Sequence, residues 1–367
     1  MMQPYFQIPP RRYSAEWFSE HELQTLRTIH RAIPGYAPTP LVSLEALAAS
    51  LGLSAVYIKD ESKRFGLNAF KALGVSAALY HYLQSHPLPS LLVSATDGNH
   101  GRAVAWQARL LGIDCVIFMP KGSASARIQS IEGEGARVIV TDSGYDDAVR
   151  LADAYAKEHG GLLVQDTALP GDESRIPSDI VLGYASMALE ALEQMEPQKP
   201  THVFLQAGVG SMASGVAAAL LHKLKGEPLT LILMEAAPLA CIALSAREGS
   251  WQKTPDAYTL MAGLNCAEPN PATLPLLLDA FDAFFPLEDS YTLRGMRRLA
   301  HPLGQDPAIV SGESGAVGTG FLESLMTEPE WTAAKERLGL TNDSVVLLFS
   351  TEGDTDPLTY QRIIQGE

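Results

Sequence analysis

The alternation of short β-branched runs with longer helix-forming stretches is the feature that most constrains the fold of this 367-residue chain. Eight runs are predicted to be buried strands, at residues 55–59, 91–96, 115–120, 137–141, 162–167, 202–207, 229–235 and 344–350. Stretches with helical spacing lie between them, such as 99–111, 145–159 and 184–195. This alternation is typical of parallel sheets that are covered by helices on both faces. We therefore predict an α/β fold built on parallel sheets.

Composition argues against several classes of function. Lys and Arg number 27 and Asp and Glu 42, so the formal net charge is −15. A domain that binds nucleic acid or anionic lipid normally carries the opposite sign. The cysteines, at 115, 241 and 266, are too few and too scattered for a disulfide framework or a metal cluster, and residues 1–12 hold no apolar signal region. We expect a cytoplasmic protein with no nucleic acid, membrane or metal as a partner.

An uncharged stretch at 203–221 is about long enough to span a bilayer. It contains Gly208, Gly210 and Gly215, and we interpret it as a buried strand, a glycine loop and a buried helix. Glycines let the backbone approach an anion, and a helix N-terminus offers free N–H groups to a phosphate. The same turn also fits a relaxed dinucleotide fingerprint, with Glu235 where a ribose-binding acid would lie. A tight turn without any ligand is the third interpretation.

The loop SATDGNHGR at 94–102 follows another predicted strand. Ligands of open α/β sheets bind beyond the carboxyl ends of the strands, so this loop is a candidate site. Backbone amides of residues 96–100 could hold a carboxylate, and Asn99 could bond a ligand oxygen. Asp97 could equally be a plain helix N-cap, and His100 is more readily interpreted as a structural histidine than as a catalyst.

A third motif, at 59–74, carries Lys59, Lys63 and Lys71. We expect Lys59 and Lys63 to be solvated surface charges. Lys71 differs, because it follows Phe70 in an apolar stretch at the start of a predicted helix. A lysine that is partly removed from water in this way suits Schiff-base chemistry, although composition alone also allows a structural role.

In chain order these motifs resemble the tryptophan-synthase-β-like, fold type II group of pyridoxal-phosphate enzymes. The matching strings extend from about residue 56 to 357 and include RFGLNAFKALG, ATDGNHGRAVAW, QDTA, QAGVGSMA, MAGLNCAEPN, SGESGA and STEGDTDP. Within that group they are most similar to the diaminopropionate ammonia-lyase family. The resemblance implies two three-layer parallel-sheet lobes with the cofactor in the cleft between them. Residues 1–88 and 188–367 would form the large lobe and 89–187 the small inserted lobe, in a chain that pairs as a homodimer.

The resemblance also implies roles for individual residues. Lys71 would form the internal aldimine with pyridoxal 5'-phosphate, Asn99 would bond the ring hydroxyl of the cofactor, and Ser350 or Thr351 would face its pyridine nitrogen. The phosphate would be held by Gly208, Val209, Gly210, Ser211 and Met212. Asp97 and Asp166 match two active-site aspartates of the family. The substrate would be bound by Thr96, Asp97, Asn99, His100 and Asp166.

The implied reaction is the β-elimination of 2,3-diaminopropionate, an amino-acid substrate, to pyruvate and two molecules of ammonia. Its cationic β-amine calls for nearby negative charge, which Asp97 and Asp166 would supply from the ends of two predicted strands. Lys71 would take the Cα proton of the L-isomer, and Asp97 would act as the base on the opposite face for the D-isomer.

Three alternatives stay open at this point. A serine or threonine dehydratase of the same fold would act on neutral hydroxyl substrates. Residues 169–172 read Leu-Pro-Gly-Asp where the lyase family has an aromatic, tyrosine-bearing stretch, which keeps that alternative in view. A nicotinamide-dependent oxidoreductase is favoured only by the glycine turn and Glu235, and leaves Lys71 unexplained. The last alternative is an inactive paralogue that only binds its ligand.

Overall fold

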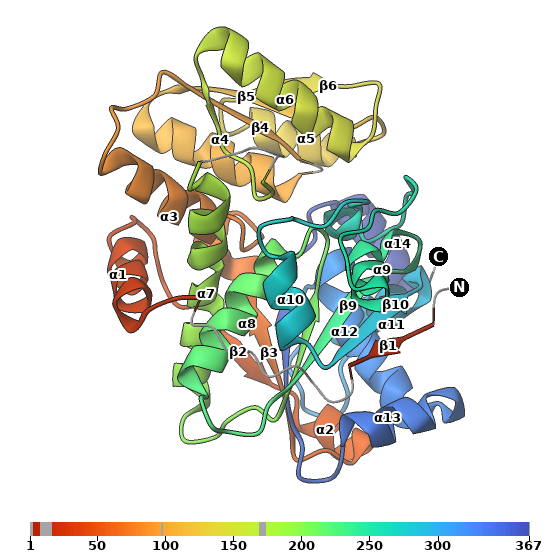
Figure 1. Cartoon of the computed structure of the whole chain (residues 1–367). Helices are drawn as coiled ribbons and strands as arrows, with labels where there is room; N and C mark the ends of the chain where they lie inside the picture. Colours follow the sequence, from red (N-terminus) through yellow and green to blue (C-terminus); the bar gives the residue numbers. More distant parts are fainter. Residues whose placement is uncertain (1–2, 8–16, 97, 169–173, 367) are drawn as a thin grey trace.

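The computed structural model describes residues 3–7, 17–96, 98–168 and 174–366, and their strands form two sheets (Figure 1). The larger sheet has seven strands in the order β1 (Tyr5–Phe6), β10 (Ala283–Leu287), β9 (Thr230–Ala236), β8 (His202–Gln206), β11 (Val345–Ser350), β3 (Ala55–Asp60) and β2 (Leu41–Ser43). Its five central strands run parallel, and β1 and β2 pair antiparallel at the two edges.

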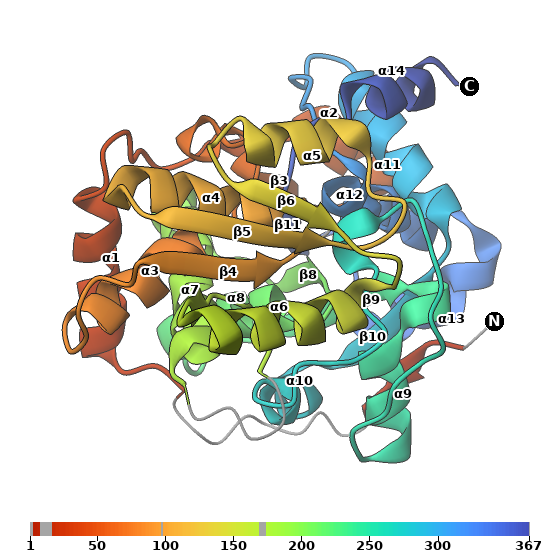
Figure 2. The ribbon, with the colours of Figure 1, turned by 90° about the horizontal axis from the view of Figure 1, so that it is seen from above.

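The smaller sheet is parallel throughout, with the order β6 (Arg137–Val140), β5 (Asp114–Met119), β4 (Leu91–Ala95) and β7 (Leu162–Leu163). Helices α4 (Asn99–Leu111) and α5 (Ser125–Glu132) cover one face, and α6 (Tyr145–His159) covers the other (Figure 2). The predicted α/β fold of helix-covered parallel sheets is thus confirmed.

Helices lie on both faces of the larger sheet because its strands bury side chains on both sides. On β8, Val203 and Leu205 belong to one core cluster and Phe204 to the other. The first side holds α3 (Ala72–Leu83), α7 (Ile176–Met195), α8 (Ser211–Lys223), α9 (Cys241–Glu248) and α10 (Leu274–Ala280), with α1 (Glu20–Arg31) packed on α3 and α7. The second side holds α2 (Glu45–Leu51), α11 (Asp289–Ala300), α12 (Glu313–Thr327), α13 (Thr332–Leu338) and α14 (Pro357–Gln365).

The uncharged stretch at 203–221 forms β8, a glycine turn and α8, as the sequence predicts. Within the described ranges, no helix is both long enough and apolar enough to cross a membrane.

The small sheet lies entirely within residues 89–187, and we propose the predicted division into a lobe of residues 89–187 and a lobe of residues 1–88 and 188–367. The C-terminal boundary of this division falls inside α7, a continuous helix that packs on α3 and α8. One core cluster also runs from the α4 face of the small sheet into α3 and α7. The two lobes therefore share buried apolar surface.

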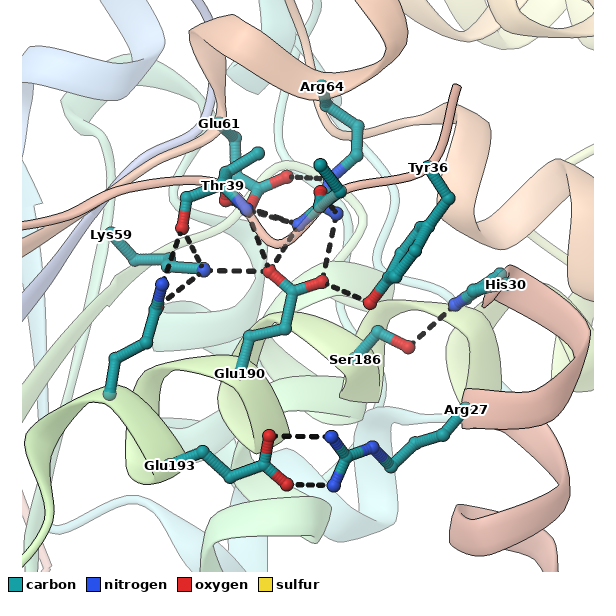
Figure 3. A network of polar contacts seen from close by, with 12 residues as sticks. Arg27, His30, Tyr36, Thr39, Lys59, Glu61, Arg64, Ser186, Glu190 and Glu193 are labelled. Carbon is teal, nitrogen blue, oxygen red and sulfur yellow. Dashed lines mark hydrogen bonds and ion pairs between the residues drawn. The ribbon is translucent and has the colours of Figure 1, made fainter. Parts of the chain in front are cut away.

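The prediction that Lys59 is a solvated charge is wrong, whereas Lys63 is exposed as expected. Lys59 is fully buried, and its Nζ lies 2.7 Å from a carboxylate oxygen of Glu190 on α7. Arg64 and Glu61 complete a buried group of two positive and two negative charges (Figure 3). The group joins α7 to the 3-10 turn Glu61–Gly66, which precedes Lys71 in the chain.

Candidate active site

A cavity opens at the carboxyl ends of β4, β8 and β11, where parallel strands leave room for ligands. The space between its walls, with the open mouth included, is about 740 Å³. Both lobes contribute to its wall. Among the residues that line it are Lys71, Thr96, Asn99, His100, Asp166, Gly208, Val209, Gly210, Ser211, Met212, Thr351 and Glu352. Three motifs that are far apart in the sequence therefore meet in one cavity.

Lys71 stands immediately before α3, and its Nζ donates a hydrogen bond to the carboxylate of Asp166. The amine also lies 5.2 Å from the ring centre of Phe70 and 5.7 Å from that of Tyr184. These rings exclude water from one side of the lysine while the cavity stays open on the other. Lys71 is therefore a partly desolvated amine that faces a ligand space, as Schiff-base chemistry requires.

Asp166 is fully buried, which by itself raises the pKa of its carboxyl. The positive charge of Lys71, with His100 and the lysine hydrogen bond adding to it, outweighs burial and holds that pKa at about 2. The hydroxyl of Ser211 donates to the backbone carbonyl of Asp166, so the aspartate is tied to the glycine turn. Asp166 is consequently a fixed negative charge at neutral pH.

His100 is buried beside Asp166, and burial lowers the pKa of its imidazole. Its Nε2 lies 2.9 Å from the carbonyl oxygen of Val164, so the neutral ring donates at Nε2. Its Nδ1 lies 4.0 Å from Asp166 Oδ2 and has no hydrogen-bond partner among the described residues. The backbone anchor agrees with the structural interpretation of this histidine, while Nδ1 lies beside the carboxylate of the cavity.

The glycine turn between β8 and α8 can hold a phosphate. Gly210 has a φ of 99°, and a Cβ there would lie 2.4 Å from Leu277 Cδ1, so the turn requires glycine. α8 begins at Ser211 without a side-chain cap, which leaves its first N–H groups available at the cavity. A helix N-terminus of this kind stabilises a bound dianion, so the residues present fit the phosphate of pyridoxal phosphate.

The other residues assigned to the cofactor divide between the cavity wall and the layer behind it. Asn99 lines the cavity as the first residue of α4. Thr351 lines it too, and its hydroxyl accepts a hydrogen bond of 3.0 Å from Gln206 Nε2. The hydroxyl of Ser350 instead donates to Ser311 Oγ at 2.7 Å. Of the two predicted hydroxyls, Thr351 is the one on the wall.

Thr96 also lines the cavity, and its hydroxyl accepts a hydrogen bond of 2.9 Å from the amide of Gly98. This bond shapes the loop that leads into α4. Two predicted features, Asp97 and the altered loop at 169–172, lie outside the described residues.

Glu235 does not serve the role that the nicotinamide alternative requires. Its side chain is fully buried, and its two carboxylate oxygens each accept a hydrogen bond of 2.8 Å, from the amides of Ile242 and Ala243. These bonds satisfy the first turn of α9, and burial raises the pKa of Glu235 to about 8. The residue is a helix cap in the interior, so the dinucleotide interpretation of the glycine turn is wrong.

The cysteines carry no disulfide. All three are buried and outside any disulfide, and the thiol of Cys241 donates to the carbonyl oxygen of Cys266 at 3.7 Å. Cys266 lines the cavity.

Sequence reasoning gave no role to several polar residues of the wall, among them Tyr145 and Glu352. Glu352 lies two residues beyond a predicted strand, and its position after a strand end is the signal that could have identified it. Tyr145 opens α6, and its hydroxyl accepts a hydrogen bond of 2.9 Å from Gln165 Nε2. No pattern in the sequence links that helix start to the cavity.

Comparison with known proteins agrees with this geometry. The model of the family described as pyridoxal-phosphate dependent enzyme matches residues 32–347. The chain is 44% identical to diaminopropionate ammonia-lyase of Escherichia coli K12 over 367 residues, which covers 95% of this chain and 92% of the relative. It is 25% identical to the catabolic L-threonine dehydratase of Staphylococcus aureus N315 over 315 residues, 86% of each chain.

A crystal structure of diaminopropionate ammonia lyase from Escherichia coli, in complex with an aminoacrylate-PLP azomethine reaction intermediate, superposes on the chain with a TM-score of 0.93. The two are 43% identical, and the match covers 99% of this chain and 96% of the other.

Proposed function

This chain belongs to the family of pyridoxal-phosphate-dependent enzymes, and we propose that it catalyses the β-elimination of 2,3-diaminopropionate to pyruvate and two molecules of ammonia. One observation carries the proposal: the amine of Lys71 faces a cavity that also contains an uncapped, glycine-rich helix N-terminus and the buried carboxylate of Asp166. When bound, pyridoxal phosphate supplies an acceptor for the electron pair left by a broken Cα–H bond.

We propose that the cofactor is held from three sides. Lys71 would attach it covalently, and Asn99 would donate a hydrogen bond to its ring hydroxyl. Ser350 or Thr351 would face the ring nitrogen, and the position of Thr351 on the wall favours that residue. The backbone amides of residues 208–212 would hold the phosphate, with the positive end of the α8 dipole behind them.

The charges of the cavity match a substrate with a cationic β-amine. The positive charge of Lys71 holds the pKa of Asp166 at about 2 against burial, so the carboxylate is ionised where it lies at the lysine ammonium group. When the lysine amine is released and acts as the base at Cα, the fixed carboxylate can pair with the β-ammonium group of the substrate. Asp166 then no longer has the ammonium group of Lys71 as its partner. A hydroxyl substrate offers no cation in its place, so the buried carboxylate of Asp166 would remain unpaired.

A pyruvate-release assay with 2,3-diaminopropionate, serine and threonine tests the proposal. We expect kcat/KM for diaminopropionate to exceed the other two by at least about tenfold, the ratio that one charged contact of ~1.5–3 kcal/mol provides. A preference for serine or threonine would instead assign the chain to the dehydratases.

Lys71→Ala should abolish both the visible absorption of the bound cofactor and the release of pyruvate. Lys63→Ala is the matched control, because Lys63 is an exposed lysine of the same segment and should leave both unchanged. A Lys71→Ala protein that keeps the activity would refute the proposal.

We assign the turnover of the D-isomer to Asp97, on the resemblance of its motif. The test is Asp97→Asn with the two stereoisomers as separate substrates. Turnover of the D-isomer should fall far more than that of the L-isomer, since Lys71 remains the base for the latter. Equal losses would remove Asp97 from this role.

We further propose that the protein is a homodimer in the cytoplasm. The resemblance supports the dimer, and three cysteines that form no disulfide suit a reducing compartment. Light scattering on the eluting protein should give twice the chain mass of 39.5 kDa, and a mass equal to that of one chain would contradict the dimer.

A further inference from the structure

Glu352 is a buried carboxylate of the cavity wall to which the proposed function gives no role. It lies just beyond the end of β11, and only 3% of its surface is exposed. Its Oε2 accepts a hydrogen bond from Asn99 Nδ2, and its Oε1 accepts one of 3.0 Å from the amide of Ser314 in the first turn of α12. Both oxygens of Glu352 therefore have a hydrogen-bond partner, Asn99 in the small lobe and Ser314 in the large lobe.

We propose that Glu352 is a positioning residue that fixes the side-chain amide of Asn99 with its N–H groups toward the ring hydroxyl of the cofactor. The inference rests on the proposed function, in which Asn99 bonds that hydroxyl. A side-chain amide has two N–H donors at one end and an oxygen acceptor at the other. A carboxylate accepts at both of its oxygens and therefore selects the nitrogen end of Asn99. The second N–H of the same nitrogen then remains for the ring oxygen of the cofactor.

The surroundings of Glu352 hold it in place for this task. Its backbone forms a bridge with Ala69, and its carbonyl oxygen accepts a hydrogen bond of 2.9 Å from the amide of Gly312. The residue before it, Thr351, accepts a hydrogen bond of 3.2 Å from the amide of Phe70. The same short segment thus contacts the loop that carries Lys71 and the start of α12, so a shift of Glu352 would disturb several elements at once.

The side chain of Glu352 lies at the N-terminal end of α12. Its partner Ser314 belongs to the N-terminal turn of α12, where the helix dipole stabilises an anion. Glu313, the first residue of α12, is a second carboxyl close to Glu352. Burial, followed by the charge of Glu352, raises the pKa of Glu313 to about 7, while Arg127 partly offsets this at 3.7 Å.

Glu352→Gln tests the inference, because it preserves the shape of the side chain and replaces one acceptor oxygen by a donor. Asn99 can then turn its oxygen toward residue 352 or toward the cofactor. In the absence of substrate, we expect the bound cofactor of this variant to show a second absorption band at shorter wavelength. This band would belong to the form whose ring hydroxyl is protonated and donates to the flipped amide. Reconstitution of the apoprotein should show about three- to tenfold weaker affinity for pyridoxal phosphate, as expected for the loss of one ordinary hydrogen bond.

Two controls separate positioning from a general structural effect. Asp354→Asn changes a carboxylate of the same segment that accepts from Asn68 Nδ2 at 3.1 Å, and it should leave the spectrum and the affinity unchanged. In an Asn99→Ala background, Glu352→Gln should change neither the spectrum nor the affinity further, because the residue acts through Asn99. If Glu352→Gln alters the cofactor equally with and without Asn99, the inference is wrong.

Failure of the inference is distinguishable from failure of the proposed function. A wild-type protein that takes up pyridoxal phosphate through Lys71, together with a Glu352→Gln variant that is spectrally identical to it, overturns only the role of Glu352. A wild-type protein that takes up no cofactor overturns both. Should Glu352→Gln not fold, Glu352→Asp withdraws the carboxylate by one methylene. The same second band is then expected, and an unchanged spectrum would again contradict the inference.

Discussion

At the scale of single residues, four buried charged side chains stabilise one another through ion pairs. They are Lys59, Glu61, Arg64 and Glu190. Glu190 accepts hydrogen bonds of 2.8 Å at both oxygens from Arg64, one of 2.7 Å from Tyr36, and lies 2.7 Å from Lys59 (Figure 3). Burial raises the pKa of Glu190, but the hydrogen bonds and charge of Arg64, with Lys59, outweigh it and hold that pKa at about 2. With Glu61 included the group is neutral, so removal of any one member leaves a buried net charge.

Glu190→Gln should lower the free energy of unfolding by about 3–5 kcal/mol, because Arg64 and Lys59 would then share a single buried carboxylate. Glu193→Gln is the matched control on the same helix, since Glu193 pairs with Arg27 at the surface with 47% of its side chain exposed. That change should cost less than about 1 kcal/mol. Urea unfolding of both variants measures the difference, and equal losses would show that the buried group contributes no more than a surface pair.

The same residues show what the sequence could and could not predict about the site. Lys71, Asn99 and the glycine turn follow predicted strands or open predicted helices, so their placement beyond the carboxyl ends of strands was foreseeable. The burial of Lys59 was not, because its partner Glu190 lies on an element more than a hundred residues away. Local composition describes a lysine among polar neighbours and contains no information on such a distant carboxylate.

At the scale of secondary structure, a strand forms within each of the eight predicted runs, although the run at 162–167 is a strand only at Leu162–Leu163. The strands β1, β2 and β10 were not foreseen. β1 and β2 have two and three residues and lie at the edges of the sheet, where pairing with a neighbour stabilises an extended segment too short to show a pattern. β10 contains Pro286, which lacks an N–H and usually argues against an inner strand. α7 begins at Ile176, eight residues before the predicted start at 184, with Pro177 in its first turn as is common for helices.

Close packing of α7 against α3 is the element-scale feature on which the position of Lys71 depends. A Cβ on Gly183 would lie 2.4 Å from the carbonyl oxygen of Leu73 and 2.6 Å from the Cα of Gly74. Gly183→Ala must therefore separate the two helices, and we expect it to lower the free energy of unfolding by about 1–3 kcal/mol. It should also weaken binding of the cofactor, because α3 starts one residue after Lys71.

Gly318→Ala provides the comparison within another buried helix. A Cβ there would meet Met234 Cε at 3.3 Å and Leu348 Cδ2 at 3.4 Å, which are mobile ends of side chains. The small crowding is offset by the ~0.5–1 kcal/mol that alanine gains over glycine inside a helix, so this variant should be close to neutral. Thermal or urea unfolding that ranks the two variants in the opposite order would contradict the assignment of Gly183 as a spacer.

At the scale of the whole molecule, carboxylates from the two lobes meet beside the cleft. Asp146 lies in the first turn of α6 in the small lobe and receives a backbone hydrogen bond from Ala267 in the large one. Burial, followed by the charges of Glu268 and Asp256, raises the pKa of Asp146 to about 6, against the opposing charge of Arg150. The folded chain thus contains a carboxyl, that of Asp146, that binds a proton more tightly than it does in the unfolded chain.

The sign of the resulting pH dependence follows from that shift. The pKa of Asp146 rises from 3.8 to about 6 on folding, so the carboxyl destabilises the fold little below pH 3.8 and fully above pH 6. Asp146→Asn should therefore raise the free energy of unfolding at pH 8 by about 1 kcal/mol, a value reduced for the partial exposure of the side chain, and leave it nearly unchanged at pH 4. Asp147→Asn, on the exposed neighbouring residue that pairs with Arg150, should show no such difference between the two pH values. Urea midpoints of the three proteins at both pH values decide the matter. If Asp146→Asn raises the free energy of unfolding equally at pH 4 and pH 8, then burial and the carboxylates of the other lobe do not raise the pKa of Asp146.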